Sequence, residues 1–189
     1  MKSMRLIGLM LLFSLLASPA AAGSLGIFFD TGGTVDNMVF ERGVPFNLHV
    51  IMYNMDDSAQ GVEFTVDLPP EIVVLSHNYV DGSLAFPYLG QPAGAVAGVQ
   101  VGLGPCRYMG QGLNEPFRVL TLTVYSPVDI VDGTVSLAGF PGPNGDVVPR
   151  YADCPDVVLH QMTTTGATLN VSVPAETPSW GSIKALFYE

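Results

Sequence analysis

Short runs in which apolar and polar residues alternate recur along most of the chain. In residues 61–68, apolar side chains occupy every second position from Val62 to Leu68, and Glu, Thr and Asp lie between them. Residues 46–53 repeat this pattern with Phe, Leu, Val and Met. Alternation with a period of two puts the apolar residues on one face of an extended strand. We therefore expect strands that pack one face on a core and turn the other face to water.

Further runs of the same kind predict the fold class. Residues 117–125 are apolar on one face and mixed on the other, which predicts a central strand. The other expected strands cover 25–29, 72–75, 96–103, 134–138, 157–159 and 168–173. Glycines and prolines separate these runs, and no helical periodicity is sustained before the last ten residues. We predict an all-β fold, a jelly-roll or immunoglobulin-like antiparallel β-sandwich of about eight to ten strands.

The first 22 residues follow a different pattern. Lys2 and Arg5 precede an apolar run, and small residues up to Ala22 follow it, as in a secretory signal peptide. The run is shorter than the ~20 residues that span a bilayer, so a retained anchor is the less favoured alternative. We predict a signal peptide at 1–22, a β-sandwich domain at 23–174, and a linker with a short C-terminal tail at 175–189. The mature chain, without a membrane span, is then expected in the periplasm, at the cell surface or outside the cell.

The net charge of the chain limits the classes of partner that it is expected to bind. Without Lys2 and Arg5, five basic side chains oppose 17 acidic ones, which gives a net charge of −12. Such a charge repels nucleic acids and anionic membranes. It suits a basic partner or a cation, although a solvated acidic surface is the simpler interpretation.

The chain contains two cysteines, Cys106 and Cys154. In an oxidising compartment, such a pair is expected to form a disulfide. The closed loop would contain 49 residues, and its closure stabilises a fold by ~4 kcal/mol in the chain-entropy model. The spacing matches neither a zinc site nor a Cys-x-x-Cys redox motif.

Several segments resemble one known family. The sequence Gly43-Val-Pro-Phe46 is followed by Gly-Val-Glu-Phe at 61–64 and Leu-Pro-Pro-Glu-Ile at 68–72. This order resembles the opening strands of cohesin-like domains, and residues 119–124 and 133–137 are similar to their later strands. The resemblance implies a sandwich related to carbohydrate-binding modules, used in surface adhesion or in docking other modules. The predicted disulfide and a long Gly/Pro loop at 139–149 differ from classical cohesins and argue against a dockerin as partner.

Catalytic motifs are not evident. No Gly-x-Ser-x-Gly nucleophile motif occurs, and the three histidines lie on separate segments: His49, His77 and His160. Paired carboxylates hydrolyse glycosides when they are held close together, and the residues considered for this role are Glu41, Glu63, Glu71 and Glu115. We interpret them as surface acids, so we predict that the protein is not an enzyme and keep a carboxylate-dependent hydrolase as the weakest alternative.

Calcium is the one cofactor to consider, as a structural ion. Asp30, Asp36 and Asn37 surround a flexible Gly-Gly pair and offer the oxygen ligands that calcium prefers. The competing interpretation is that these residues form turns through backbone hydrogen bonds. The segments 56–57 and 129–132 are weaker candidates.

Loop aromatics suggest a sugar-binding surface. Exposed rings stack on sugars, and the residues expected in or near loops are Tyr79, Phe86, Tyr88, Tyr108 and Tyr151. The competing interpretation is that these rings cap the core, since aromatic side chains bury large areas. We therefore predict a secreted, non-catalytic β-sandwich for extracellular binding, adhesion or surface assembly, with a carbohydrate-binding module as the alternative. The partner would be an extracellular glycan or protein, and the oligomeric state is left open.

Overall fold

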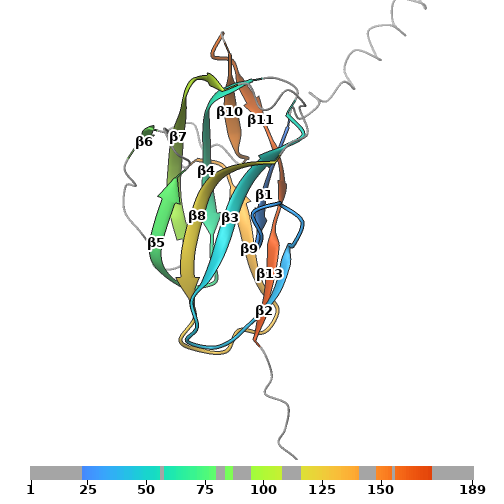
Figure 1. Ribbon diagram of the computed structural model, residues 1–189, viewed down its shortest axis with the longest axis vertical. Helices are drawn as coiled ribbons and strands as arrows, with labels where there is room; N and C mark the ends of the chain where they lie inside the picture. The colour runs from blue at the N-terminus through green and yellow to red at the C-terminus, as the bar shows by residue number, and fades with distance from the viewer. Residues whose placement is uncertain are drawn as a thin grey trace, which may run out of the picture.

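The computed structural model describes residues 23–55, 58–79, 84–86, 95–107, 116–140, 148–154 and 156–171. These residues contain thirteen strands and no helix (Figure 1). The strands form two facing sheets, as the sequence predicts for a β-sandwich. The expected eight to ten strands are an undercount, because several strands of three or four residues are too short to show an alternating pattern.

The first sheet has five strands in the order β12-β1-β3-β8-β5. Their bounds are β12 Thr163–Thr165, β1 Ser24–Phe28, β3 Phe46–Tyr53, β8 Phe117–Tyr125 and β5 Val73–Tyr79. All neighbours are antiparallel except β1 and β12, which run parallel. β8 lies between β3 and β5, so the prediction that 117–125 forms a central strand is confirmed.

The second sheet contains a path in the order β11-β10-β4-β9-β13-β2, and β7 and β6 extend it from the other edge of β4. The strands of the path are β11 Leu159–Gln161, β10 Arg150–Asp153, β4 Ala59–Asp67, β9 Gly133–Ala138, β13 Ala167–Val171 and β2 Asn37–Phe40. The two added strands are β7 Ala95–Arg107 and β6 Leu84–Phe86. β4 is the centre of this sheet, since it pairs with β7, β9 and β10.

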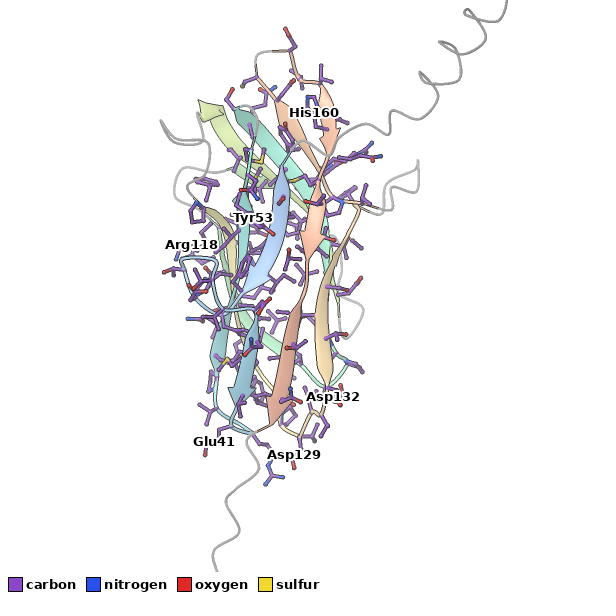
Figure 2. All side chains as sticks on the ribbon, turned by 90° about the vertical axis from the view of Figure 1, so that its right-hand side faces the viewer. Glu41, Tyr53, Arg118, Asp129, Asp132 and His160 are labelled. Carbon is purple, nitrogen blue, oxygen red and sulfur yellow. The ribbon has the colours of Figure 1, made fainter. Side chains whose placement is uncertain are left out.

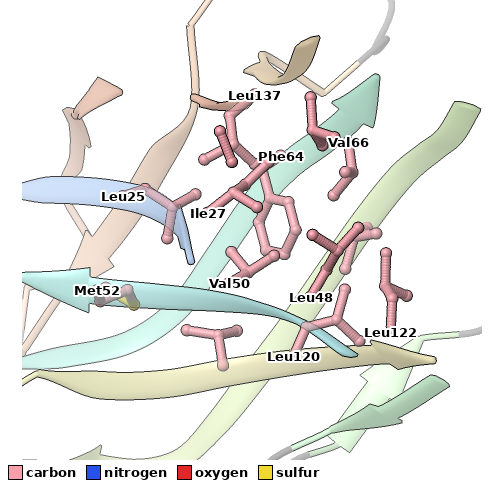
Figure 3. Close-up of a cluster of buried hydrophobic side chains, with 14 of the residues drawn as sticks. Leu25, Ile27, Leu48, Val50, Met52, Phe64, Val66, Leu120, Leu122 and Leu137 are labelled. Atoms are coloured by element: carbon pink, nitrogen blue, oxygen red, sulfur yellow. The ribbon is translucent and has the colours of Figure 1, made fainter. Parts of the chain in front are cut away.

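The core lies between the sheets (Figure 3). Phe64 on β4 is fully buried, with Leu48 and Val50 of β3 and Leu120 and Leu122 of β8 in the same cluster. Burying a side chain of this size contributes about 1.5–3 kcal/mol. The predicted inward positions from Val62 to Leu68 are therefore confirmed, whereas Thr65 is buried rather than facing water. Its hydroxyl donates a hydrogen bond to the carbonyl of Gly139 at 3.0 Å, which compensates for its lost contact with water.

A loop at residues 29–36 covers part of the outer face of the first sheet. Phe29 donates a backbone hydrogen bond to the carbonyl of Val35, and Gly33 packs over Ile51 of β3. As a result Ile51 and His49, which point away from the core, are nevertheless buried, His49 to 6% exposure. His49 thus occupies the outward, polar face of β3, paired with Thr121, but it is buried there rather than open to water.

Candidate functional site

A shallow groove crosses the outer face of the second sheet where β4, β7, β10 and β11 meet. Its floor contains Gly61, Gly102 and Ala152, and its volume is about 190 Å³. These three residues are direct partners, because Gly61 pairs with Gly102 on one side and with Ala152 on the other. Residues with little or no side chain leave the sheet uncovered, so an incoming side chain can approach its backbone.

A polar cluster borders this floor. The neighbouring row of the sheet pairs Arg150 with Glu63 and Glu63 with Gln100. Arg150 Nη2 lies 2.8 Å from Glu63 Oε1, and Arg150 Nε donates to the same oxygen at 3.0 Å. Gln100 Nε2 donates to Glu63 Oε2 at 3.2 Å. The two charges are 21% and 16% exposed, so this pair is shielded from water more than an ordinary surface ion pair.

The β10–β11 hairpin forms one wall of the groove. Leu159 lines the wall and is 51% exposed. At the hairpin end, Asp153 Oδ1 accepts the backbone N–H of Val158 at 2.7 Å, and Asp153 Oδ2 lies 2.8 Å from His160 Nε2. The hydrogen bond with His160 is the main cause that lowers the pKa of Asp153 below its usual value. Figure 2 shows His160 at the end of the molecule opposite Glu41 and Asp129.

Of the aromatic candidates, Tyr79 and Tyr151 are the two whose side chains the structure describes. Tyr151 is only 1% exposed, and its ring stacks on that of His160 with centroids 5.1 Å apart. The proposal that Tyr151 stacks on a sugar is therefore wrong, because the ring belongs to the core. Tyr79 is half-buried and packs against the same core.

The other aromatic candidates are placed only in part. The backbone register pairs Phe86 of β6 with Gln100, in line with the polar row of the groove. The side chain of Phe86, and the residues Tyr88 and Tyr108, lie outside what the structure describes.

The Asp30 loop is a hydrogen-bonded turn. Asp30 Oδ1 accepts the backbone N–H groups of Thr34 and Val35 at 2.9 and 2.7 Å, and Oδ2 accepts that of Gly32 at 3.1 Å. The Val35 bond is the largest cause that lowers the pKa of Asp30. This geometry matches the turn-forming alternative, since both oxygens already have protein donors.

The other calcium candidates lie beside this turn. Asp36 Oδ1 accepts a hydrogen bond from Asn37 Nδ2 at 3.3 Å. Within the described residues, no group of three or more His, Cys, Asp or Glu side chains is placed to hold a metal ion. Calcium binding at Asp30, Asp36 and Asn37 stays a prediction.

The described histidines and carboxylates do not assemble into one site. His49 Nδ1 lies 3.0 Å from Thr121 Oγ1 under the 29–36 loop, and burial is the main cause that lowers its pKa. His160 belongs to the hairpin, and the ring of His77 packs edge-on against Tyr79 at 5.4 Å. Glu63 is engaged by Arg150 and Gln100.

The predicted cysteine pairing concerns two segments on either side of β4. Arg107, which follows Cys106, and Asp153, which precedes Cys154, both pair with Ala59 of β4. Cys106 therefore lies on β7 and Cys154 directly follows β10, and these two strands flank β4. Cys154 is buried and is not a free cysteine. The bond to Cys106 stays a prediction, since the side chain of Cys106 is not described.

The segments 1–22 and 175–189, predicted as the signal peptide and the tail, lie outside the described residues. In the part that is described, no helix has the length and apolar character needed to cross a membrane.

Comparison with solved structures defines the fold as cohesin-like. The cohesin module of a family 33 glycoside hydrolase from Clostridium perfringens superposes with a TM-score of 0.58 at 10% identity, over 80% of this chain and 98% of that module. A non-cellulosomal cohesin from Archaeoglobus fulgidus gives 0.53 at 12% identity, over 81% and 93%. The sixth cohesin of Acetivibrio cellulolyticus scaffoldin B, solved in complex with a Cel5 dockerin, gives 0.51 at 11% identity, over 79% and 99%.

The chain therefore has a cohesin-like β-sandwich domain, as the sequence resemblance implies. No protein-family model and no curated protein matches the sequence.

The groove could not be recognised from the sequence. The sequence places Gly61 and Gly102 within predicted strands. A glycine in a strand usually marks a bulge or a site where another backbone or a ligand approaches closely. Only the register of β4, β7 and β10 shows that they meet with Ala152 on one face.

Proposed function

We propose that this chain is a secreted, non-catalytic β-sandwich module that binds an extracellular protein through the groove on β4, β7, β10 and β11. The observation that carries this proposal is the combination of an apolar floor at Gly61, Gly102 and Ala152 with a hydrogen-bonded polar border. Protein interfaces have this anatomy, with an apolar centre and a polar rim. The role would be adhesion or assembly at a cell surface.

The solved cohesins add independent support. One of them was solved in complex with a dockerin, so the same fold serves protein docking elsewhere. The low identity of 11% leaves the partner of the present chain open. The excess of acidic residues favours a partner with a basic surface, because opposite charges accelerate encounter.

A hydrolytic function has weaker support. Among the described residues, His49, His77 and His160 are held in different places, and Glu63 is bound to Arg150. A robust, metal-independent hydrolysis of glycosides or esters by the purified protein would overturn the non-catalytic proposal.

The docking proposal is tested with two variants of one hairpin. Leu159→Asp places a charge on the groove wall, whereas Val157→Asp places the same charge on the exposed hairpin turn, at a position that does not line the groove. Immobilised wild type is used to capture proteins from the extracellular fraction of its source. Each captured protein is then purified and titrated against all three forms by calorimetry.

We expect at least one purified protein to bind wild type and Val157→Asp equally, and Leu159→Asp at least about tenfold more weakly, which corresponds to ~1.4 kcal/mol. Equal binding to all three forms, or no protein that rebinds after purification, would refute the assignment of the groove.

A further inference from the structure

The outer face of the first sheet carries two rows of hydrogen-bonding side chains without an acidic residue. One row pairs Asn47 of β3 with Thr123 of β8 and Thr123 with Ser76 of β5. Two residues further along β8, Thr121 pairs with Asn78 of β5 on one side and with the buried His49 of β3 on the other, whose Nδ1 lies 3.0 Å from Thr121 Oγ1. Because neighbouring strands lie about 4.8 Å apart, each row is a regular array of hydroxyl and amide groups.

These groups are accessible in the described structure. Asn47, Ser76 and Asn78 are exposed, and Thr121 and Thr123 are half-buried. Thr123 donates a hydrogen bond to Asn47 Oδ1 at 2.9 Å, which fixes the Asn47 amide and leaves its Nδ2 donors directed elsewhere. Hydroxyl and amide groups both donate and accept, so the rows offer hydrogen bonds of both kinds.

The two rows lie between the aromatic ring of Tyr125 on one side and the 29–36 loop on the other. Tyr125, half-buried, follows Thr123 on the same face of β8, where it pairs with the exposed Val73. On the other side, the 29–36 loop rises over β3, where Gly33 packs on Ile51. β3, β8 and β5 lie side by side in Figure 1, so these features form one continuous strip.

The strip differs in charge from the chain as a whole. The chain has 17 acidic residues and a net charge of −10, but none of the acids lies on the outward positions of β3, β8 and β5. Among those described positions Arg118, at the end of the strip away from Tyr125, carries the only permanent charge. A charged side chain is costly to strip of water, whereas hydroxyls and amides exchange water for a ligand at small cost.

We propose that this strip, defined by Asn47, Ser76, Asn78, Thr121, Thr123 and Tyr125, binds a neutral polysaccharide. A neutral sugar chain is a flat polymer of hydroxyl donors and acceptors, which matches rows of hydroxyls and amides and is neither attracted nor repelled by acidic groups. The Tyr125 ring provides an apolar edge for the carbon face of a sugar. This strip is on the opposite sheet from the groove, so the proposal does not depend on the docking function.

The test uses affinity electrophoresis and calorimetry with defined probes: hydroxyethylcellulose, xylan and mannan as neutral polymers, and polygalacturonate as an anionic polymer. Ser76→Asp and Asn78→Asp introduce charge at exposed positions of the edge strand β5. Thr134→Asp introduces it on β9 of the other sheet, also at an exposed position. Unfolding midpoints of all variants are measured first, so that loss of binding is compared only between folded proteins.

We expect wild type and Thr134→Asp to bind at least one neutral polymer, and each β5 variant to bind it about tenfold more weakly or not at all. No binding to any neutral polymer, equal binding by the β5 variants, or binding to polygalacturonate alone would overturn the proposal. We expect Ser76→Asp to leave capture of a protein partner at the groove unchanged, since β5 belongs to the other sheet, so the two proposals fail separately.

Discussion

Glu63 on β4 holds Arg150 of the β10–β11 hairpin, with Arg150 Nη2 2.8 Å from Glu63 Oε1. The same carboxylate accepts a hydrogen bond from Gln100 on β7 at 3.2 Å, so one side chain ties three strands together beside the groove. The position of the hairpin, and with it the groove wall, depends on this contact.

Removal of the Arg150 side chain tests this link. We expect Arg150→Ala to lower the free energy of unfolding by about 1–3 kcal/mol, because it leaves a shielded carboxylate without its charged donor. Backbone amides of β10 and β11 should also exchange with deuterium faster. The control is Arg42→Ala, whose ion pair with Asp129 is longer at 3.9 Å and 63% and 59% exposed. It should change stability by less than about 0.5 kcal/mol, and a larger effect than that of Arg150→Ala would contradict the account.

Substitution of Phe64 tests the packing between the two sheets. We expect Phe64→Ala to destabilise the domain by about 3–5 kcal/mol in urea unfolding, because it leaves a cavity in the core. Val39→Ala removes an apolar side chain that is 66% exposed on β2, and should cost less than about 0.5 kcal/mol. Comparable losses for the two variants would mean that the core is not centred on β4.

Acid should destabilise the fold through Asp30 and Asp153. Hydrogen bonds lower the pKa of both carboxyls below the usual value of 3.8. The unfolded chain therefore takes up protons at these groups before the folded protein does, and acid favours unfolding. Their stabilising contribution is complete above about pH 5 and is lost as the pH falls through 3.8 and below.

The double variant Asp30→Asn with Asp153→Asn should flatten this decline in the urea midpoint at low pH. Replacing the exposed Asp129 with Asn is the control. A decline that is unchanged in the double variant would show that these hydrogen bonds do not carry the effect.

Protonation of His49 should affect the stability of the fold in a higher pH range than the two carboxyls do. Burial lowers the pKa of His49 below 6.5, so the folded protein keeps the ring neutral while the unfolded chain is protonated. Stability should therefore already decrease between about pH 7 and pH 5. His49→Gln should remove that part of the dependence, and His77→Gln, on the exposed edge strand β5, should leave it in place. If both variants kept the wild-type profile, the burial of His49 would not be the cause.

The predicted disulfide is tested by a non-reduced peptide map. A peptide linking Cys106 to Cys154 is expected, and Cys106→Ser with Cys154→Ser should lower stability by ~4 kcal/mol. The control is reduced wild type, which keeps both cysteine side chains but lacks the bond between them. Two free thiols in the native protein would refute the pairing.

The sequence was sufficient for the fold class but not for the position of the site. The strands β3, β4 and β8 are long and alternate clearly, so their inward residues, such as Phe64, were predictable. β2 and β10 have four residues each and cannot show a period of two reliably. The sequence therefore predicts Tyr151 in or near a loop, although it is a core residue of β10.

The remaining differences come from long-range packing. His49 and Thr65 occupy polar positions in alternating strands, but other segments cover them, the 29–36 loop in one case and the segment at Gly139 in the other. Alternation reports which face a residue occupies, not whether another segment covers that face. The groove has the same origin, since Gly61 and Ala152 are far apart in sequence and meet only through strand pairing.

The most direct test of the docking function is hydrogen–deuterium exchange of the full chain with and without a purified protein that it binds. We expect slower exchange on binding in β4 at 59–63, in β7 at 99–103 and in β10 at 150–152, with no change in β5. Slower exchange confined to the first sheet or to the 29–36 loop would place the docking surface elsewhere and contradict the central claim.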